Sequence, residues 1–286
     1  MEVSMTQIIG LLIKLCILSS VFGLGLNTSW RDVTHLLRNH SLFLRSLLAM
    51  YIATPLIAVL LCEFDPIPLS IKIAILLMAI STGAPLLPKK TLKLGDDHQY
   101  VQSLSVIASL FAIITVPLSL TAMGAYYGRQ IDFDVGQIAA RIVLTVLAPL
   151  LVGMVVRSMA GALAERMAQP ILSLAGITLL LLGVVIIATG FKAIIGIGVL
   201  GIVAIAVMVG ASLAVGHALG GPDGTDRTTL AIACATRFPG LGLLIASQNF
   251  PGAKPMPVLV TYLLVSNLTA LPYQLWRKKA HAGSKT

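Results

Sequence analysis

An arginine lies in the middle of an apolar stretch at residues 233–246 (ACATRFPGLGLLIA), where a proline and two glycines follow it. In a membrane-embedded segment such a charge is costly, usually faces the protein interior and marks a functional site by default. The guanidinium of Arg237 can bind a carboxylate or a phosphate through two parallel hydrogen bonds. The chemistry that this residue predicts is therefore the binding of an anion.

The composition places this stretch in a membrane. Of the 286 residues, 57% are hydrophobic and only 11% are charged, whereas soluble domains carry about 25% charged residues. The apolar residues form continuous runs of about 20, the length that spans a bilayer, without the alternation of a β-barrel. The net charge of +9 comes from basic residues in short connections, which favours membrane topology and anionic lipid over nucleic acid as its explanation.

Nine apolar segments predict nine transmembrane helices, at about 5–27, 42–62, 69–95, 99–125, 136–157, 168–190, 194–219, 227–250 and 255–276. Lys and Arg are concentrated in alternate connections and in the tail, and the positive-inside rule makes these cytoplasmic. We therefore expect a multi-pass protein of the plasma (inner) membrane, with its N-terminus outside and its C-terminus in the cytoplasm. The first segment begins with an acidic residue and contains a lysine, which favours a retained span over a signal peptide.

Two of the nine segments are interrupted. The third contains STGAPLLPKK and the eighth contains TRFPGLG, and prolines so placed should unwind a helix. The predicted orientation makes the two interrupted spans run in opposite directions at matching positions of two inverted halves. Residues 1–134 form four spans, the third broken near 83–88, and residues 135–286 form five, the eighth broken near 237–240. Spans one to four map onto six to nine, and span five is an extra.

Paired interruptions of this kind are typical of secondary transporters, with the binding site between them. The alternative is two proline kinks in a membrane sensor or scaffold. For a transporter, the predicted substrate-binding residues are those at the two breaks and a lysine that follows the first: Ser81, Thr82, Gly83, Ala84, Pro85, Lys89, Thr236, Arg237, Phe238, Pro239 and Gly240. Lys89 would steer anions or merely anchor the helix end. Arg237 would bind substrate, or bond freed carbonyls of Gly83 and Ala84, and Gly240 and Gly242 would allow a close crossing of the breaks.

The stretches MAISTGAPLLPKKTLKLGDDHQYVQSLSV, ATRFPGLGLLIASQNFP and LVSNLTALPYQLWRKK resemble the bile acid:sodium symporter family, and more narrowly its bacterial branch. The resemblance implies an all-α fold of two inverted repeats, in which two discontinuous helices cross in a core domain beside a panel domain. Nine-span members lack the first helix of the first repeat. By this resemblance, spans three, four, eight and nine form the core, and spans one, two, six and seven form the panel, with span five adjoining it.

The sequence departs from the sodium-coupled members at both breaks. Leu86, Leu87 and Pro88 replace a polar run that ends in Ser–Asn, and Ala233 and Arg237 stand where a glutamate and a glutamine bind sodium. The resemblance leaves Na⁺ as a possible coupling ion with a reduced set of candidate ligands: Ser81, Thr82, Gln102, Ser103, Ala233 and Thr236. At the start of span four, Gln102 and Ser103 could equally cap a helix or join two helices. Alternatively, Arg237 replaces the ion as a fixed positive charge.

Other functions have less support in the sequence. An intramembrane enzyme would need a paired-carboxylate, Ser/His/Asp or metal-binding set, and none is found; the three cysteines have no metal or disulfide spacing. A sensor would need an output module, and the tail after Trp276 has ten residues. We therefore expect a transporter of a small, amphipathic organic anion with no cofactor, whose other partner is membrane lipid. The sequence leaves the substrate's identity and the oligomeric state open.

Overall fold

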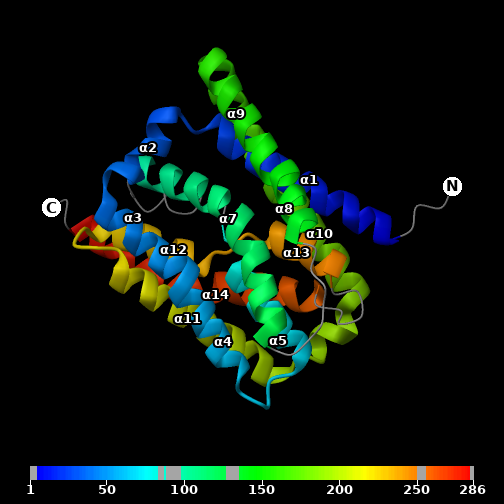
Figure 1. Cartoon of the computed structure of the whole chain (residues 1–286). Coiled ribbons are helices and arrows are strands. Elements are labelled where there is room, and N and C mark those ends of the chain that lie inside the picture. The colour runs from blue at the N-terminus through cyan, green and yellow to red at the C-terminus, as the bar shows by residue number, and fades with distance from the viewer. Residues whose placement is uncertain (1–4, 83–86, 88–97, 127–134, 250–255, 284–286) are drawn as a thin grey trace.

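The computed structural model describes residues 5–82, 87, 98–126, 135–249 and 256–283, and the regular elements in these residues are helices. In chain order they are α1 (Met5–Leu26), α2 (Trp30–Arg38), α3 (His40–Leu47), the π-helical η1 (Leu48–Ala53), α4 (Thr54–Cys62), α5 (Leu69–Ile80), α7 (His98–Tyr126), α8 (Val135–Ile142), the π-helical η3 (Val143–Leu147), α9 (Ala148–Met159), α10 (Gly161–Ile195), α11 (Gly198–Leu219), α12 (Gly224–Ala235), α13 (Pro239–Asn249) and α14 (Met256–Gly283). Figure 1 shows their arrangement.

Eight of the helical stretches in the described residues are long and apolar enough to cross a membrane. They coincide with eight of the nine predicted spans to within four residues at each end, except that the sixth begins seven residues earlier than predicted, at Gly161. Helices α12 and α13 together form the eighth span. The ninth is the predicted third span, of which α5 is the described part. The protein is therefore an all-α polytopic membrane protein of about nine transmembrane helices, as predicted.

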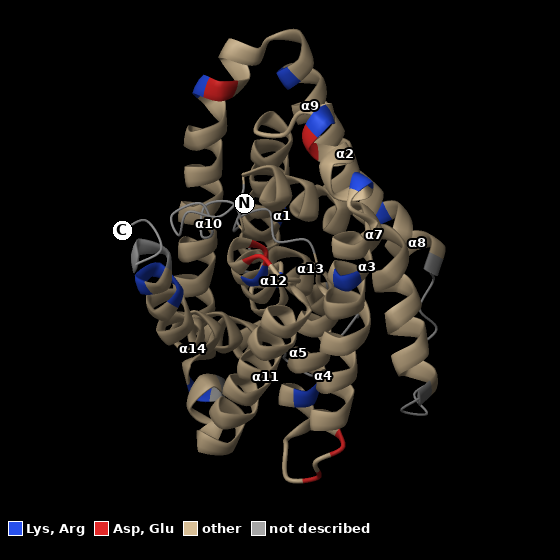
Figure 2. Ribbon diagram, turned by 90° about the vertical axis from the view of Figure 1, so that its left-hand side faces the viewer, with Lys and Arg blue, Asp and Glu red and all other residues tan. Residues whose placement is uncertain are grey.

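The outer surface of the helix bundle is apolar. Large aliphatic side chains on different helices are more than half exposed, among them Leu11, Ile114, Leu180, Val199 and Leu268. In water such a surface would favour aggregation, whereas lipid tails solvate it without cost. Charged residues lie mostly near helix ends and connections, and long stretches of ribbon carry none (Figure 2). Both features fit a bundle surrounded by lipid.

The helices form two groups by their contacts. Helix α1 packs most extensively against α10 and α9, and these three form one group on one side of the molecule (Figure 1). In the other group α11 packs against α12 and α14, α4 against α5 and α11, and α2 against α7. The predicted panel of spans one, two, six and seven is therefore wrong for spans two and seven, which pack with the interrupted helices. Span five, ending in α9, belongs with α1 and α10.

Backbone contacts at glycines explain this grouping. A Cβ on Gly153 of α9 would lie 2.6 Å from the Phe22 carbonyl oxygen and 2.9 Å from the Cα of Gly25, both in α1. A Cβ on Gly216 of α11 would lie 2.5 Å from the Cα of Ala231 in α12. Small residues let transmembrane helices approach this closely, and the gain in packing drives their association. The two contacts assign α9 to α1 and α11 to α12.

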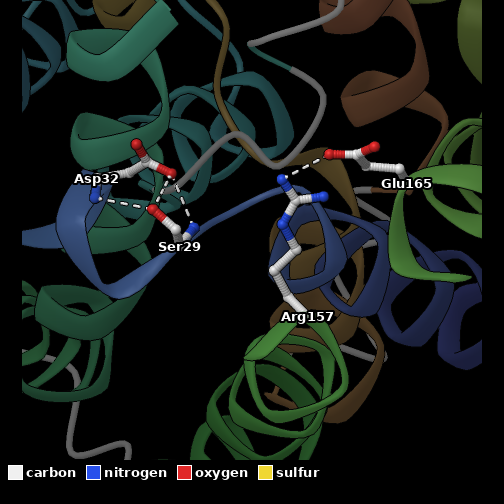
Figure 3. Close-up of polar contacts among 4 residues, drawn as sticks. All are labelled: Ser29, Asp32, Arg157 and Glu165. Atoms are coloured by element: carbon white, nitrogen blue, oxygen red, sulfur yellow. Dashed lines mark hydrogen bonds and ion pairs between the residues drawn. The ribbon is translucent and has the colours of Figure 1, made fainter. Parts of the chain in front are cut away.

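Local polar contacts shape two of the connections (Figure 3). The Ser29 hydroxyl accepts a hydrogen bond from the Asp32 backbone N–H, and the Asp32 carboxylate accepts one from the Ser29 N–H at 2.7 Å, a capping box that starts α2. Arg157 of α9 and Glu165 of α10 form an ion pair at 2.9 Å. Because the Glu165 side chain is 67% exposed, this pair contributes little to the stability of the fold.

Candidate substrate-binding site at two interrupted helices

The second predicted interruption meets the end of α5 in the interior of the protein, and the first, predicted near 83–88, lies largely outside the described residues. Helix α5 ends at Ile80, and α12 ends at Ala235, four residues before α13 begins. The backbone N–H of Phe238, in the second break, donates to the carbonyl of Ser81, in the first, at 2.9 Å. This one hydrogen bond pairs a carbonyl of the first segment with an N–H of the second, and both groups would otherwise lack a partner within the membrane. Pro239 begins the second half-helix, where its missing N–H costs no helical hydrogen bond.

The two glycines of the second break have different neighbours. A Cβ on Gly242 would lie 3.2 Å from the Met78 sulfur and 3.4 Å from the Ser81 hydroxyl, so this glycine does allow a close approach of the two interrupted helices. A Cβ on Gly240 would instead lie 2.9 Å from a side-chain carbon of Ile17 in α1. Its predicted approach to the first break concerns Gly83, Ala84 and Pro85, which lie outside the described residues, so this part stays a prediction.

Arg237 is buried at this meeting point, with 2% of its surface exposed. It lies on the span most enclosed by protein, in which 89% of the most apolar window is buried, against 50% or less in the other seven candidate spans. Its Nη1 donates to the Met50 carbonyl of η1 at 3.3 Å. Within the described part of the chain, its Nε and Nη2 have no hydrogen-bond partner. Its electrostatic neighbours are Cys234, Tyr262 and Tyr51.

A proline in the second span makes the acceptor for Arg237. In η1 the Thr54 N–H donates to the Ala49 carbonyl five residues earlier, so it does not reach Met50 in the usual i−4 register. The next donor in the π-helical register would be residue 55, and Pro55 has no N–H. The Met50 carbonyl therefore loses both helical donors and accepts from Arg237 instead. A π-bulge often occurs at a functional site, and here it anchors the buried cation.

We predict that Pro55→Ala weakens the binding of an anion at Arg237 by roughly threefold, about half of a typical hydrogen-bond contribution. The alanine N–H would compete with Nη1 for the Met50 carbonyl and leave the guanidinium less firmly positioned. Pro149→Ala is the matched control, because Pro149 follows η3 at the same place in α9. The dissociation constant of a transported anion is measured for both variants. Equal values would contradict the anchoring role of Pro55.

Several predicted substrate-binding residues lie around Arg237. Thr82 carries a buried hydroxyl that has no hydrogen-bond partner in the described residues, and the same is true of Tyr262 on α14. The Ser81 hydroxyl donates to Leu77 at 2.6 Å. Phe238 is buried, whereas Thr236 and Pro239 are half-buried in a segment otherwise enclosed from Thr228 to Ala246. The break is thus where this span is accessible from outside the protein.

The predicted ion ligands do not form one cluster in the hydrogen bonds of the structure. Ser103 joins α7 to α2, because its hydroxyl accepts from the Leu36 N–H at 3.0 Å and donates to the Val33 carbonyl at 3.2 Å. Gln102 accepts from the Thr28 hydroxyl at 3.2 Å, next to the start of α2. Ala233 is buried among apolar side chains. The helix-joining alternative describes the contacts of Gln102 and Ser103, and ion binding by this set stays a prediction.

Four predicted residues, Gly83, Ala84, Pro85 and Lys89, lie outside the described residues. The prediction that Arg237 bonds the Gly83 and Ala84 carbonyls lies there too. Sequence reasoning missed Met50, Tyr51 and Tyr262, since these contacts join positions far apart in the chain. The one feature of the sequence that could have indicated the Met50 contact is Pro55, because a proline within a span leaves a backbone carbonyl without its helical donor. Among the described residues, no three His, Cys, Asp or Glu side chains are placed to share a metal ion.

These features define an integral membrane protein in which two interrupted helices meet around a buried cation. Residues 14–197, more than half of the chain, match the model of the Sodium Bile acid symporter family. The chain belongs to this family, which makes it a sodium-coupled or related solute transporter. A search of curated proteins found no match. The matched residues include α5 and the first break but end before α12, so the description of Arg237 rests on the structure.

Proposed function

We propose that this protein is a secondary active transporter that moves a small organic anion across the membrane by alternating access. The observation that carries the proposal is Arg237, a buried arginine at the junction of two interrupted helices, with two nitrogens that lack partners among the described residues. An unpaired charge inside a protein destabilises the fold. A residue of this kind is retained at such a position when it binds something there.

The surroundings of Arg237 favour an anion with an apolar body. Phe238, Ala233 and Cys234 are buried within four residues of it along the chain, and Tyr51 and Tyr262 interact with it electrostatically from other helices. Binding sites of this composition use a few polar groups for orientation and apolar walls for affinity. Together they support an amphipathic organic anion as the substrate class.

The family makes Na⁺ the first candidate for a coupling ion, supplied with ligands by hydroxyls and backbone carbonyls of the two breaks. A second candidate mechanism is sodium-independent transport in which Arg237 acts as the fixed charge. One observation favours the second: the guanidinium is bound to Met50, in the wall of the site. A cation held there repels a second cation within a few ångströms, strongly so at low dielectric. In this mechanism the guanidinium of Arg237 supplies the positive charge that a bound Na⁺ would otherwise supply to the site.

Uptake by proteoliposomes tests the function and separates the two mechanisms. We expect time-dependent uptake of a radiolabelled amphipathic anion above that of protein-free liposomes, saturable by unlabelled anion. An inwardly directed Na⁺ gradient, with choline replacing external Na⁺ in the control, should accelerate uptake if Na⁺ is coupled and leave it unchanged if Arg237 replaces the ion. A panel of organic anions of which none is taken up or stabilises the purified protein would contradict the transport function and favour a sensor or scaffold.

We further propose that the protein lies in the plasma (inner) membrane with its N-terminus outside and its C-terminus in the cytoplasm. The support is the concentration of Lys and Arg in alternate connections. Arg31 and Arg38 precede the second span, Arg157 and Arg166 flank the α9–α10 connection, and Arg277 lies near the C-terminal end of α14. Basic residues near helix ends set orientation in this way. The anion would then meet the site alternately from each side.

A further inference from the structure

We infer that the anionic group bound at Arg237 is a carboxylate, gripped by the Nε and Nη2 edge of the guanidinium. This inference rests on the proposed function and adds the chemical identity of the recognised group. Three features of the site support it: the nitrogen of Arg237 that is anchored, the two nitrogens that lack partners, and the buried hydroxyls around the break.

The anchored nitrogen leaves one complete edge of the guanidinium available. Nη1 is engaged by the Met50 carbonyl at 3.3 Å. Nε and Nη2, the two nitrogens without partners among the described residues, lie on the side away from Nη1 and present two parallel N–H groups. This edge matches the two oxygens of a carboxylate, and such bidentate pairs are among the strongest hydrogen-bonded contacts in proteins. The anchor therefore orients the fork as well as holding the charge.

The remaining donors match the acceptor capacity of a carboxylate. An ionised carboxylate has two oxygens with about four lone-pair sites. The fork fills two of them. The hydroxyl of Tyr262 is buried and lacks a partner among the described residues, so it can donate one hydrogen bond, and Thr82, which interacts with Tyr51, carries a second buried hydroxyl. Tyr262 is an electrostatic neighbour of Arg237, and Thr82 directly follows Ser81, whose carbonyl binds the residue after Arg237.

Charge and shape exclude the common competitors at this position. A phosphate dianion would bring a second negative charge, and Arg237 is the only fixed charge among the described residues of its span beyond the first turn of α12. A sulfonate has a third oxygen that would be buried without a donor, which costs as much as an unmade hydrogen bond. A neutral amide lacks the charge that Arg237 needs. The carboxylate leaves the fewest groups unsatisfied.

Matched probes test the inference on the purified full-length protein. Hexanoate, 1-pentanesulfonate and hexanamide share one five-carbon chain, and benzoate, benzenesulfonate and benzamide share a phenyl ring. Dissociation constants come from ligand-dependent shifts of the melting temperature. We expect at least one carboxylate to bind about tenfold or more tightly than its sulfonate, the effect of one charge-assisted hydrogen bond, and the amides not to bind.

Arg237→Lys keeps the charge and removes the fork, so we expect carboxylate affinity to fall about tenfold or more and the preference over sulfonate to disappear. Arg31→Lys on the exposed face of α2 is the matched control.

Tyr262→Phe leaves Arg237 intact and should weaken carboxylate binding several-fold, so the inference remains testable if Arg237→Lys does not fold. Equal binding of sulfonate and carboxylate, or an unchanged preference in Arg237→Lys, would overturn the carboxylate while leaving anion transport standing. A panel in which no anion binds would overturn both.

Discussion

Replacing Arg237 by glutamine is expected to abolish uptake of the organic anion without lowering the stability of the protein. The variant removes the positive charge that the proposed substrate needs, and removing one partner of a buried charge pair costs about 3 kcal/mol, or roughly a hundredfold in affinity. It also removes a buried charge that has one hydrogen bond in the described structure, to Met50. The glutamine amide can still donate to a carbonyl, so the interaction between helices is partly retained.

Stability separates the two roles of Arg237. If the arginine mainly holds the breaks together, Arg237→Gln should lower the melting temperature in detergent and in the absence of ligand. If it mainly binds substrate, the melting temperature should stay the same or rise, because functional charges are often kept at the expense of stability. Arg31→Gln, on the exposed face of α2, controls for loss of an arginine in general. Undiminished uptake by a folded Arg237→Gln protein would contradict the proposed substrate role.

Sequence reasoning located the second interruption because the effect of proline on a helix is local. Pro239 cannot donate to a preceding carbonyl wherever it lies, and the helix ends at Ala235 accordingly. The same holds for the apolar runs, whose length alone predicts a span. The burial of Arg237 followed from its cost in lipid. These parts of the fold and of the site depend on residues close together in the chain.

Contacts between distant residues could not be predicted in this way. Met50 and Arg237 are separated by 187 positions, and their pairing depends on a backbone carbonyl that Pro55 leaves free, which no side-chain pattern in the sequence indicates. The grouping of spans two and seven was taken from a resemblance and failed. It is decided by backbone contacts such as that of Gly216 with Ala231, and a glycine in a sequence does not show which helix it approaches.

The largest effect on stability is expected from Gly25→Ala in α1. The Cβ of alanine would lie against the carbonyl oxygen of Leu150 and 3.0 Å from the Cα of Gly153, both of them backbone atoms of α9. Side chains can move away from such a contact, but two helices held at backbone distance must separate along their length. Overpacking of this kind costs about 1–3 kcal/mol, so we expect the melting temperature to fall by roughly 5 °C or more.

Gly10→Ala in the same helix is the matched control, since a Cβ there would have no atom within 4 Å. Alanine is favoured over glycine in a helix by about 1 kcal/mol, so Gly10→Ala should be neutral or stabilising. The melting temperatures of the two variants are compared with the wild-type value in the same detergent. If α1, α9 and α10 move as one body during transport, Gly25→Ala should also reduce uptake per folded molecule, because it loosens that body. A Gly25→Ala protein as stable and active as Gly10→Ala would show that the α1–α9 contact is not required for either property.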